Sequence, residues 1–203
     1  VLYRSNAQSR AIEEALLRIS IPYRIYGGLR FYERLEIKNA IAYLKIIFNN
    51  NDNPSFERSI SNPTRGVGEK TLGKIRQTAQ KYNISYIKAS AKLIDEGSIS
   101  GRGGSGLRDY LEFVAGCKSF IEDNSLSDLM ELIIKESGLY SYHAKEAGEK
   151  GKTRTENLEE LITATKNFEQ SVKEDKTNTE IAENYLDVIS LDAGDRQAAE
   201  HDD

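Results

Sequence analysis

Two glycines one residue apart open a basic segment in the stretch NPTRGVGEKTLGKIRQ, residues 62–77. Glycine permits a positive φ and lets backbone N–H groups come close to a ligand. A helix beginning just after Gly68 would add free N–H donors and partial positive charge, which suit a phosphate group. Arg65 before the glycine pair and Lys70 after it favour contact with a nucleic-acid backbone. The alternative is an ordinary tight turn between two helices.

Two further glycine-containing stretches resemble nucleotide-binding loops but do not fit them. GEKGKTR, residues 148–154, lacks the glycine that a phosphate-binding loop needs five residues before Gly151, and no strand is predicted to precede it. It is interpreted as a charged break in which Lys150, Lys152 and Arg154 form a basic loop near a nucleic-acid backbone. GRGGSG, residues 101–106, is interpreted as a flexible connector with Arg102 as an incidental contact.

The stretch YRSN, residues 3–6, follows the first predicted strand. Arg4 and Asn6 stand where that strand runs into a loop, a favoured ligand position in α/β sheets. A helix cap formed by Ser5 or Asn6 explains the same residues equally well. A single cysteine excludes an internal disulfide, and one cysteine with two histidines argues against a zinc cluster. No arrangement of residues suggests catalytic machinery.

The elements that must position these residues are mostly helices. Residues 1–28 predict a short strand, a helix and a second strand, and such a β-α-β unit normally belongs to a larger sheet. Beyond Gly28, apolar residues recur at helical spacing. Helices are predicted over 37–48, 56–62, 69–81, 84–95, 107–121, 126–134, 158–168 and 182–189, with loops at 97–106, 147–154 and 171–180. The fold class is therefore mainly α, with a helix-hairpin-helix-like element around Gly66 and Gly68.

The net charge of −4 conceals a separation of charge along the chain. Residues 1–85 contain fourteen Lys or Arg against seven Asp or Glu, whereas residues 169–203 contain three against eleven. The basic first part predicts a polyanionic partner, although a surface of this size also carries such a charge ordinarily. No apolar run approaches the roughly 20 residues that span a membrane. We expect a soluble, cytoplasmic protein without a membrane partner, and the start at Val1 suggests a piece of a longer chain.

Four segments together resemble the UvrD/PcrA/Rep group of superfamily 1 DNA helicases over about residues 1–170. They are VLYRSNAQSRAIEEALL, IPYRIYGGLRFYERLEIKNAIAYLKII, NPTRGVGEKTL and GEKGKTRTENLEELITATKNF. The resemblance implies that residues 1–37 are part of motor subdomain 2A and that residues 38–203 are the helical inserted subdomain 2B, with an acidic loop and tail from about residue 169. GRGGSG is richer in glycine than the resemblance leads one to expect.

The resemblance also implies roles for the residues singled out above. Arg4 and Asn6 would contact single-stranded DNA, and a second set would hold the backbone of the duplex near its junction with the single strand. That second set comprises Thr64, Arg65, Gly66, Gly68, Lys70, Lys150, Lys152 and Arg154. The ATP-binding loop, the magnesium ligands and the arginine finger of the group have no counterpart here. ATP and Mg²⁺ would therefore act in the full-length helicase, in DNA repair or replication, and not on this part alone.

Two functions follow as expectations. In the first, the chain is a duplex-gripping, regulatory subdomain of an ATP-dependent 3′–5′ DNA helicase and works beside the remaining helicase domains. In the second, it is a module that docks DNA-repair proteins, and DNA contact is secondary. The acidic tail, which is unsuited to DNA, leaves room for the second.

Overall fold

The computed structural model describes residues 12–13, 15–16, 18–19, 21, 31–172 and 176–199. The two predicted strands, Arg4 and Asn6 lie outside these residues. The described positions between 12 and 18 are helical, in agreement with the helix predicted there.

Every regular element within the described part of the chain is a helix, which confirms the mainly α prediction. A short 3-10 helix, η1 (Phe31–Glu33), precedes α2 (Leu35–Phe48), so the predicted boundary after residue 37 falls inside α2. The remaining helices are α3 (Asn53–Ser61), α4 (Glu69–Tyr82), α5 (Tyr86–Asp95), α6 (Gly101–Asp123), α7 (Leu126–Glu136), α8 (Leu139–Ala144), α9 (Glu149–Ser171) and α10 (Asn178–Ala199).

Local sequence signals explain several helix boundaries. Asp52 caps α3 by accepting a hydrogen bond from the backbone N–H of Ser55 at 2.9 Å. Ser125 and Asp128 form a reciprocal capping box at the start of α7. Asn83 ends α4 in the left-handed conformation with φ +52°, which asparagine tolerates better than most residues.

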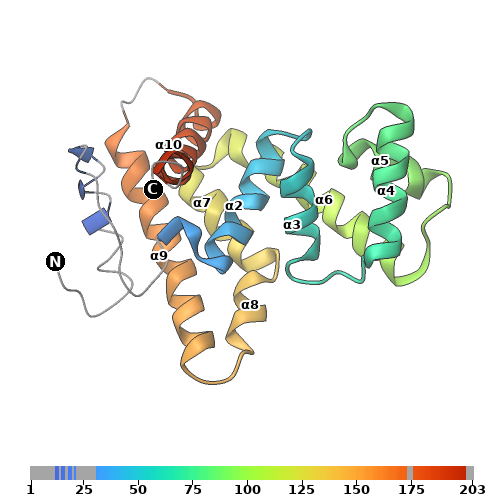
Figure 1. Ribbon diagram of the computed structural model, residues 1–203, viewed down its shortest axis with the longest axis horizontal. Helices are drawn as coiled ribbons and strands as arrows, with labels where there is room; N and C mark the ends of the chain where they lie inside the picture. Colours follow the sequence, from blue (N-terminus) through green and yellow to red (C-terminus); the bar gives the residue numbers. More distant parts are fainter. Residues whose placement is uncertain are drawn as a thin grey trace.

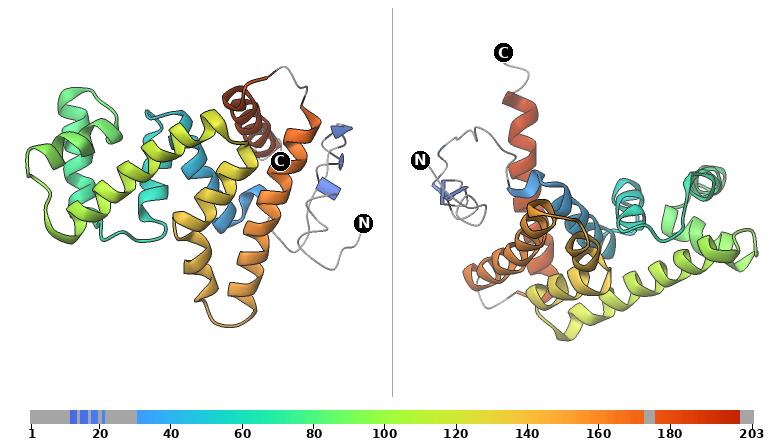
Figure 2. Two further views of the ribbon diagram at one scale, coloured as in Figure 1. Left: turned by 180° about the vertical axis from the view of Figure 1, so that it is seen from behind. Right: turned by 90° about the horizontal axis from the view of Figure 1, so that it is seen from below.

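The core is organised around α2, in which ten of the fourteen residues are buried. This helix packs against α3, α6, α7 and α9. The α4–α5 pair lies at one end of the molecule, and the long helix α6 connects it to the central helices (Figures 1 and 2). The α8–α9 hairpin projects at the lower edge of Figure 1, the same edge to which the α3–α4 loop extends. The α8–α9 turn and the α3–α4 loop, which are far apart in the sequence, thus both lie on the lower side of the molecule in Figure 1.

A buried leucine in α9 provides a test of this core. Leu161 is completely buried, and Leu161→Ala is expected to lower the free energy of unfolding by about 2–5 kcal/mol because it leaves a cavity. Chemical denaturation measures the change. Thr163→Ala, at an exposed position of the same helix, should stay within about 0.5 kcal/mol of the wild type. Equal stability of the two variants would show that α9 presents a different face to the core.

Candidate nucleic-acid interface

The α3–α4 loop, residues 62–68, contains two glycines that differ in conformation. Gly66 has φ +76°, a value that L-residues rarely adopt, so glycine is required there by the backbone. Gly68 has φ −92° and is the N-cap of α4, and a Cβ atom at this position would meet nothing within 4 Å. The expectation of a positive φ therefore holds for Gly66 only. At Gly68 the open space lies outside the protein.

The backbone of this loop presents unused donors to solvent. Within the described part of the chain, the N–H groups of residues 66–70 donate no hydrogen bond to protein. Thr64, Gly66, Gly68 and Lys70 are all exposed, and Lys70 forms no ion pair with a described residue. Free amides, the first turn of a helix and an unpaired ammonium group together make a surface suited to a phosphate.

Arg65 does not share this exposure. Its guanidinium Nη2 donates to the Tyr43 hydroxyl at 2.8 Å and to the Ser137 carbonyl oxygen at 3.0 Å. The same group lies over the rings of Tyr43 and Tyr110, 5.8 and 5.7 Å from their centroids. Burial raises the pKa of the Tyr43 hydroxyl, and the charge of Arg65 offsets part of that rise. Arg65 thus anchors the loop to α2, α6 and the end of α7.

The start of α6 supports the loop from another side, and this corrects the prediction of a flexible connector over 101–106. Residues 97–100 are non-helical, as predicted. GRGGSG forms the first turns of α6. A Cβ atom at Gly106 would overlap the Arg65 carbonyl oxygen, and one at Gly103 would lie 3.2 Å from the Gly66 carbonyl oxygen. The glycines are needed for close packing of a helix on the loop, and not for flexibility. Arg102, whose side chain lies against Gly66, is thereby brought to the candidate surface.

Two carboxylates near the loop are neutralised within the protein. Arg76 binds Glu57 through Nε at 2.6 Å and Nη2 at 2.8 Å, and its Nη1 donates to Glu69. The hydrogen bond from Arg76 lowers the pKa of the Glu57 carboxyl group. Arg76 is therefore not available to a ligand, but it limits the repulsion that Glu57 and Glu69 would exert on a phosphate.

The predicted break at 147–154 is mostly helical, because α9 begins at Glu149. Gly151 is buried, and a Cβ atom there would overlap the Glu146 carbonyl oxygen and lie 2.8 Å from that of His143. Glycine thus lets the first turn of α9 pack against the end of α8. Lys150 and Lys152 are exposed at this turn, and Lys152 lies 3.9 Å from Glu156.

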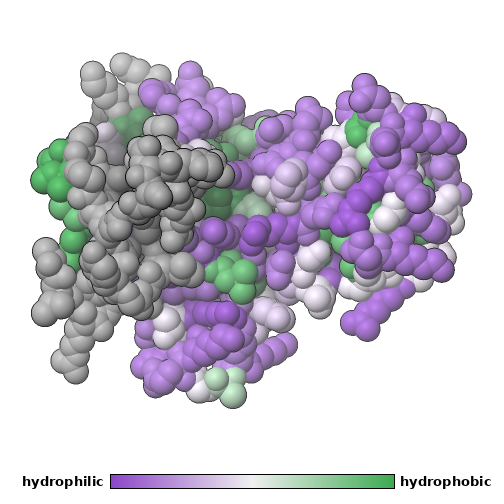
Figure 3. All heavy atoms as spheres, in the orientation of Figure 1, coloured by the Kyte–Doolittle hydropathy of each residue, from purple (hydrophilic) through white to green (hydrophobic). Residues whose placement is uncertain are grey.

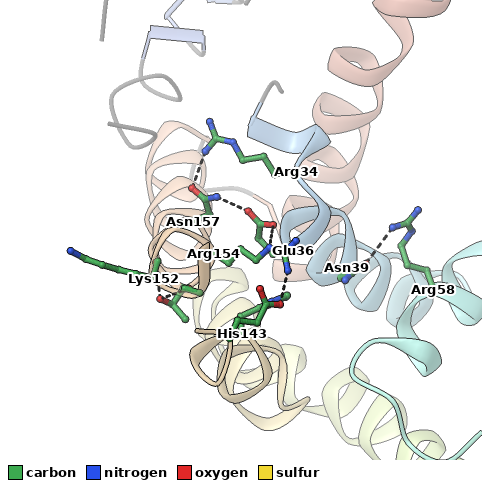
Figure 4. A network of polar contacts seen from close by, with 11 residues as sticks. Arg34, Glu36, Asn39, Arg58, His143, Lys152, Arg154 and Asn157 are labelled. Carbon is green, nitrogen blue, oxygen red and sulfur yellow. Dashed lines mark hydrogen bonds and ion pairs between the residues drawn. The ribbon is translucent and has the colours of Figure 1, made fainter. Parts of the chain in front are cut away.

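Arg154 points into the protein and belongs to a buried polar network (Figure 4). Its Nη1 donates to Glu146 Oε1 at 2.5 Å, and its Nε lies 3.6 Å from Glu36 Oε2. His143, almost completely buried, contacts the same Glu146 oxygen through Nδ1 at 3.0 Å. These hydrogen bonds, first that of His143 and then that of Arg154, lower the pKa of Glu146.

The network continues across the junction between η1, α2 and α9. Asn157 Nδ2 donates to Glu36 Oε1, and the Asn157 carbonyl oxygen Oδ1 accepts from Arg34 Nη1 at 2.9 Å. Glu36 and Asn157 are buried, with relative exposures of 4% and 3%. Arg34, Glu36 and Arg154 thus join the start of α2 to the first turns of α9, as Figure 4 shows.

Both segments predicted from the sequence expose lysines, but sequence reasoning did not separate exposed cations from inward-facing ones. Thr64, Gly66, Gly68 and Lys70 lie together at one loop, and Lys150 and Lys152 lie at the α8–α9 turn. Arg65 and Arg154 hold these two segments from within. Sequence reasoning gave Arg102 only an incidental contact on a flexible connector and missed that its segment is helical and packs on the loop. The small residues at 103 and 106, one helical turn apart, were the available signal.

Among the residues that the structure describes, no group of three or more His, Cys, Asp or Glu side chains is placed to bind a metal ion. No helix in the same part of the chain has both the length and the apolar character needed to cross a membrane.

Comparison with known proteins gives a consistent set of relatives. The family described as the UvrD-like helicase C-terminal domain matches residues 1–99. DNA helicase II of Escherichia coli (strain K12) is 45% identical over 198 residues, which cover 98% of this chain and 27% of that protein. ATP-dependent DNA helicase PcrA of Bacillus subtilis (strain 168) is 34% identical over 200 residues, with 98% and 27% covered. The chain spans about a quarter of the length of these relatives.

Proposed function

Because the chain belongs to the UvrD/PcrA family of DNA helicases, we propose that its helical body is the inserted subdomain with which such a helicase grips duplex DNA. In this proposal the α3–α4 loop and α4 form a helix-hairpin-helix-like element that contacts the phosphate backbone. Such contacts fix position and orientation on a duplex and carry no sequence information. The subdomain therefore binds duplexes of any sequence and regulates unwinding.

The observation that carries the proposal is that the backbone N–H groups of residues 66–70 and the Lys70 ammonium group have no partner among the described residues. Thr64, Gly66 and Gly68 expose the same stretch of backbone. Lys150 and Lys152 supply a second, weaker contact from the α8–α9 turn. Arg65 and Arg154 act indirectly, since their guanidinium groups are bound to protein and position the two segments.

The full-length protein would supply what this chain lacks. We expect it to be an ATP-dependent 3′–5′ DNA helicase of the cytoplasm that uses ATP and Mg²⁺ in its motor domains and acts in repair or replication. Arg4 and Asn6 are assigned to single-stranded DNA in the same proposal. The partners would be the junction of duplex and single-stranded DNA and the remaining helicase domains.

A second candidate function, docking of DNA-repair proteins, is favoured by α10. Glu180, Glu183 and Asp187 are exposed on this helix, and a face of this charge repels a phosphate backbone. DNA contact and protein docking could thus occupy different faces of the molecule. A salt titration separates them, because only phosphate contacts make DNA affinity fall steeply with salt.

Gly68→Val tests the proposed approach of DNA to the backbone. A valine is compatible with φ −92° and ψ 177° and enters open space, so we expect an unchanged fold. The added methyl groups occupy the volume assigned to a phosphate, so affinity for a blunt duplex should fall about tenfold or more, a loss of about 1.4 kcal/mol. Fluorescence anisotropy of the full-length protein measures it.

Two controls make that result specific. Gly73→Ala, also on α4 with nothing within 4 Å of its Cβ position, should leave duplex affinity unchanged. ATP hydrolysis stimulated by single-stranded DNA should persist in both variants, because it depends on the motor domains. A lower melting temperature of Gly68→Val with wild-type duplex affinity would mean that the loop is only a turn.

A further inference from the structure

Four polar residues form a stripe along the exposed face of α4. Lys70, Lys74, Gln77 and Lys81 recur at intervals of four, three and four residues, which places them within about 60° of arc on an α-helix. Lys70, Lys74, Gln77 and Lys81 are all exposed. The opposite face of the same helix is buried and consists of Leu72, Ile75 and Ala79. The surface over α3, α4 and α5 is predominantly hydrophilic in the view of Figure 3.

The positive charges of this stripe are not neutralised by described residues. Lys74 Nζ donates to the Ser98 carbonyl oxygen at 2.9 Å, and Lys81 Nζ lies 5.0 Å from the centroid of the Tyr82 ring. Neither a carbonyl group nor a ring cancels a full charge. In contrast, Lys92 and Lys135 are paired with carboxylates one turn away on their own helices. The stripe is thus an array of charges without protein counterions in the described part of the chain.

The stripe is continuous with the α3–α4 loop. Lys70 follows Gly68 by two residues, and the helix then carries Lys74 and Lys81 away from the loop. Eleven residues separate the first and last lysine, a distance of about 16 Å along the helix axis. A duplex presents about ten phosphate charges over that length, because it carries one charge per about 1.7 Å.

We infer that the Lys70–Lys81 face of α4 is a continuation of the duplex-binding surface, on which the phosphate backbone runs along the helix beyond the glycine loop. The inference rests on the proposed function in duplex binding. It adds two contacts, Lys74 and Lys81, to those proposed for the α3–α4 loop and Lys70. The ligand of this surface is the DNA backbone, because a row of ammonium groups without carboxylate partners among the described residues complements a row of phosphates.

The salt dependence of binding tests the inference charge by charge. Lys74→Gln and Lys81→Gln in the full-length protein should each reduce the magnitude of the log–log slope of blunt-duplex affinity against NaCl concentration by about 0.9. Gln77→Lys, which completes the stripe, should increase it by about 0.9. Lys166→Gln removes an exposed lysine on α9 and serves as the matched control, with no change of slope expected.

The outcomes distinguish this inference from the proposed function. If Gly68→Val weakens duplex binding while Lys74→Gln and Lys81→Gln leave the slope unchanged, the extended surface is wrong and the loop contact stands. If Gly68→Val also has no effect, both are wrong. Polyglutamate, an acidic peptide, is tested as a third ligand. If Lys74→Gln and Lys81→Gln weaken polyglutamate binding but do not change duplex binding, the stripe is a protein-docking face and the inference is overturned.

Discussion

Gly106→Ala is expected to destabilise the protein by about 3 kcal/mol and to abolish tight duplex binding, because the added methyl group overlaps the Arg65 carbonyl oxygen. The obstructing atom belongs to the backbone, so no side-chain rotation relieves the overlap. The start of α6 and the α3–α4 loop must separate. That separation pulls Arg65 away from Tyr43 and Ser137, which hold it at 2.8 and 3.0 Å.

Glycine-to-alanine substitutions at other positions of α6 separate the effect of the steric overlap from that of helix propensity. Gly116→Ala lies on the same helix with nothing within 4 Å of its Cβ position, and it should stabilise the protein by up to about 1 kcal/mol. At Gly103 the Cβ position lies 3.2 Å from the Gly66 carbonyl oxygen, so the stability of Gly103→Ala should lie between those of the Gly106 and Gly116 variants. Urea denaturation and blunt-duplex affinity are measured on the same preparations. Equal stability of the Gly106 and Gly116 variants would refute the packing of α6 on the loop.

The sequence predicted most helices because their apolar residues recur at helical spacing. The stripe of α2 and the stripe of α9 beyond Leu158 fall inside the observed helices. The start of α6 was missed because several glycines in one turn each cost about 1 kcal/mol of helix propensity, and packing against the loop offsets that cost. The six-residue helix α8 was missed because it is too short to show a period.

The candidate site was only partly predictable for a related reason. Residue type and spacing gave the position of each cation but not the direction of its side chain. Arg65 binds the carbonyl oxygen of Ser137, 72 residues away, and Arg154 reaches Glu36 on another helix. Such partners follow from the tertiary arrangement, so a basic residue beside a glycine predicts a phosphate contact and an internal anchor equally well.

The second large effect is expected for Arg154→Leu. Its removal leaves the buried Glu36 with the Asn157 amide but without a cationic partner among the described residues. Breaking a buried ion pair from one side costs about 3–5 kcal/mol, and we expect the lower end, about 3 kcal/mol, because Asn157 remains. Lys152→Leu, two residues away with 68% of its side chain exposed, should change stability by less than about 0.5 kcal/mol.

These two variants separate an internal anchor from a DNA contact. If Arg154 binds protein, Arg154→Leu lowers stability and leaves the salt slope of duplex binding per folded molecule unchanged, whereas loss of a direct phosphate contact would reduce the slope by about 0.9 at wild-type stability. The pH dependence of stability gives an independent check.

The pKa of Glu146 is lowered in the folded protein. Its ionised carboxylate therefore contributes to the free energy of unfolding above the ordinary carboxyl range, and this contribution is lost as pH falls through the lowered pKa. The stability difference between wild type and Arg154→Leu should therefore shrink in acid, and a constant difference would place the role of Arg154 outside this network.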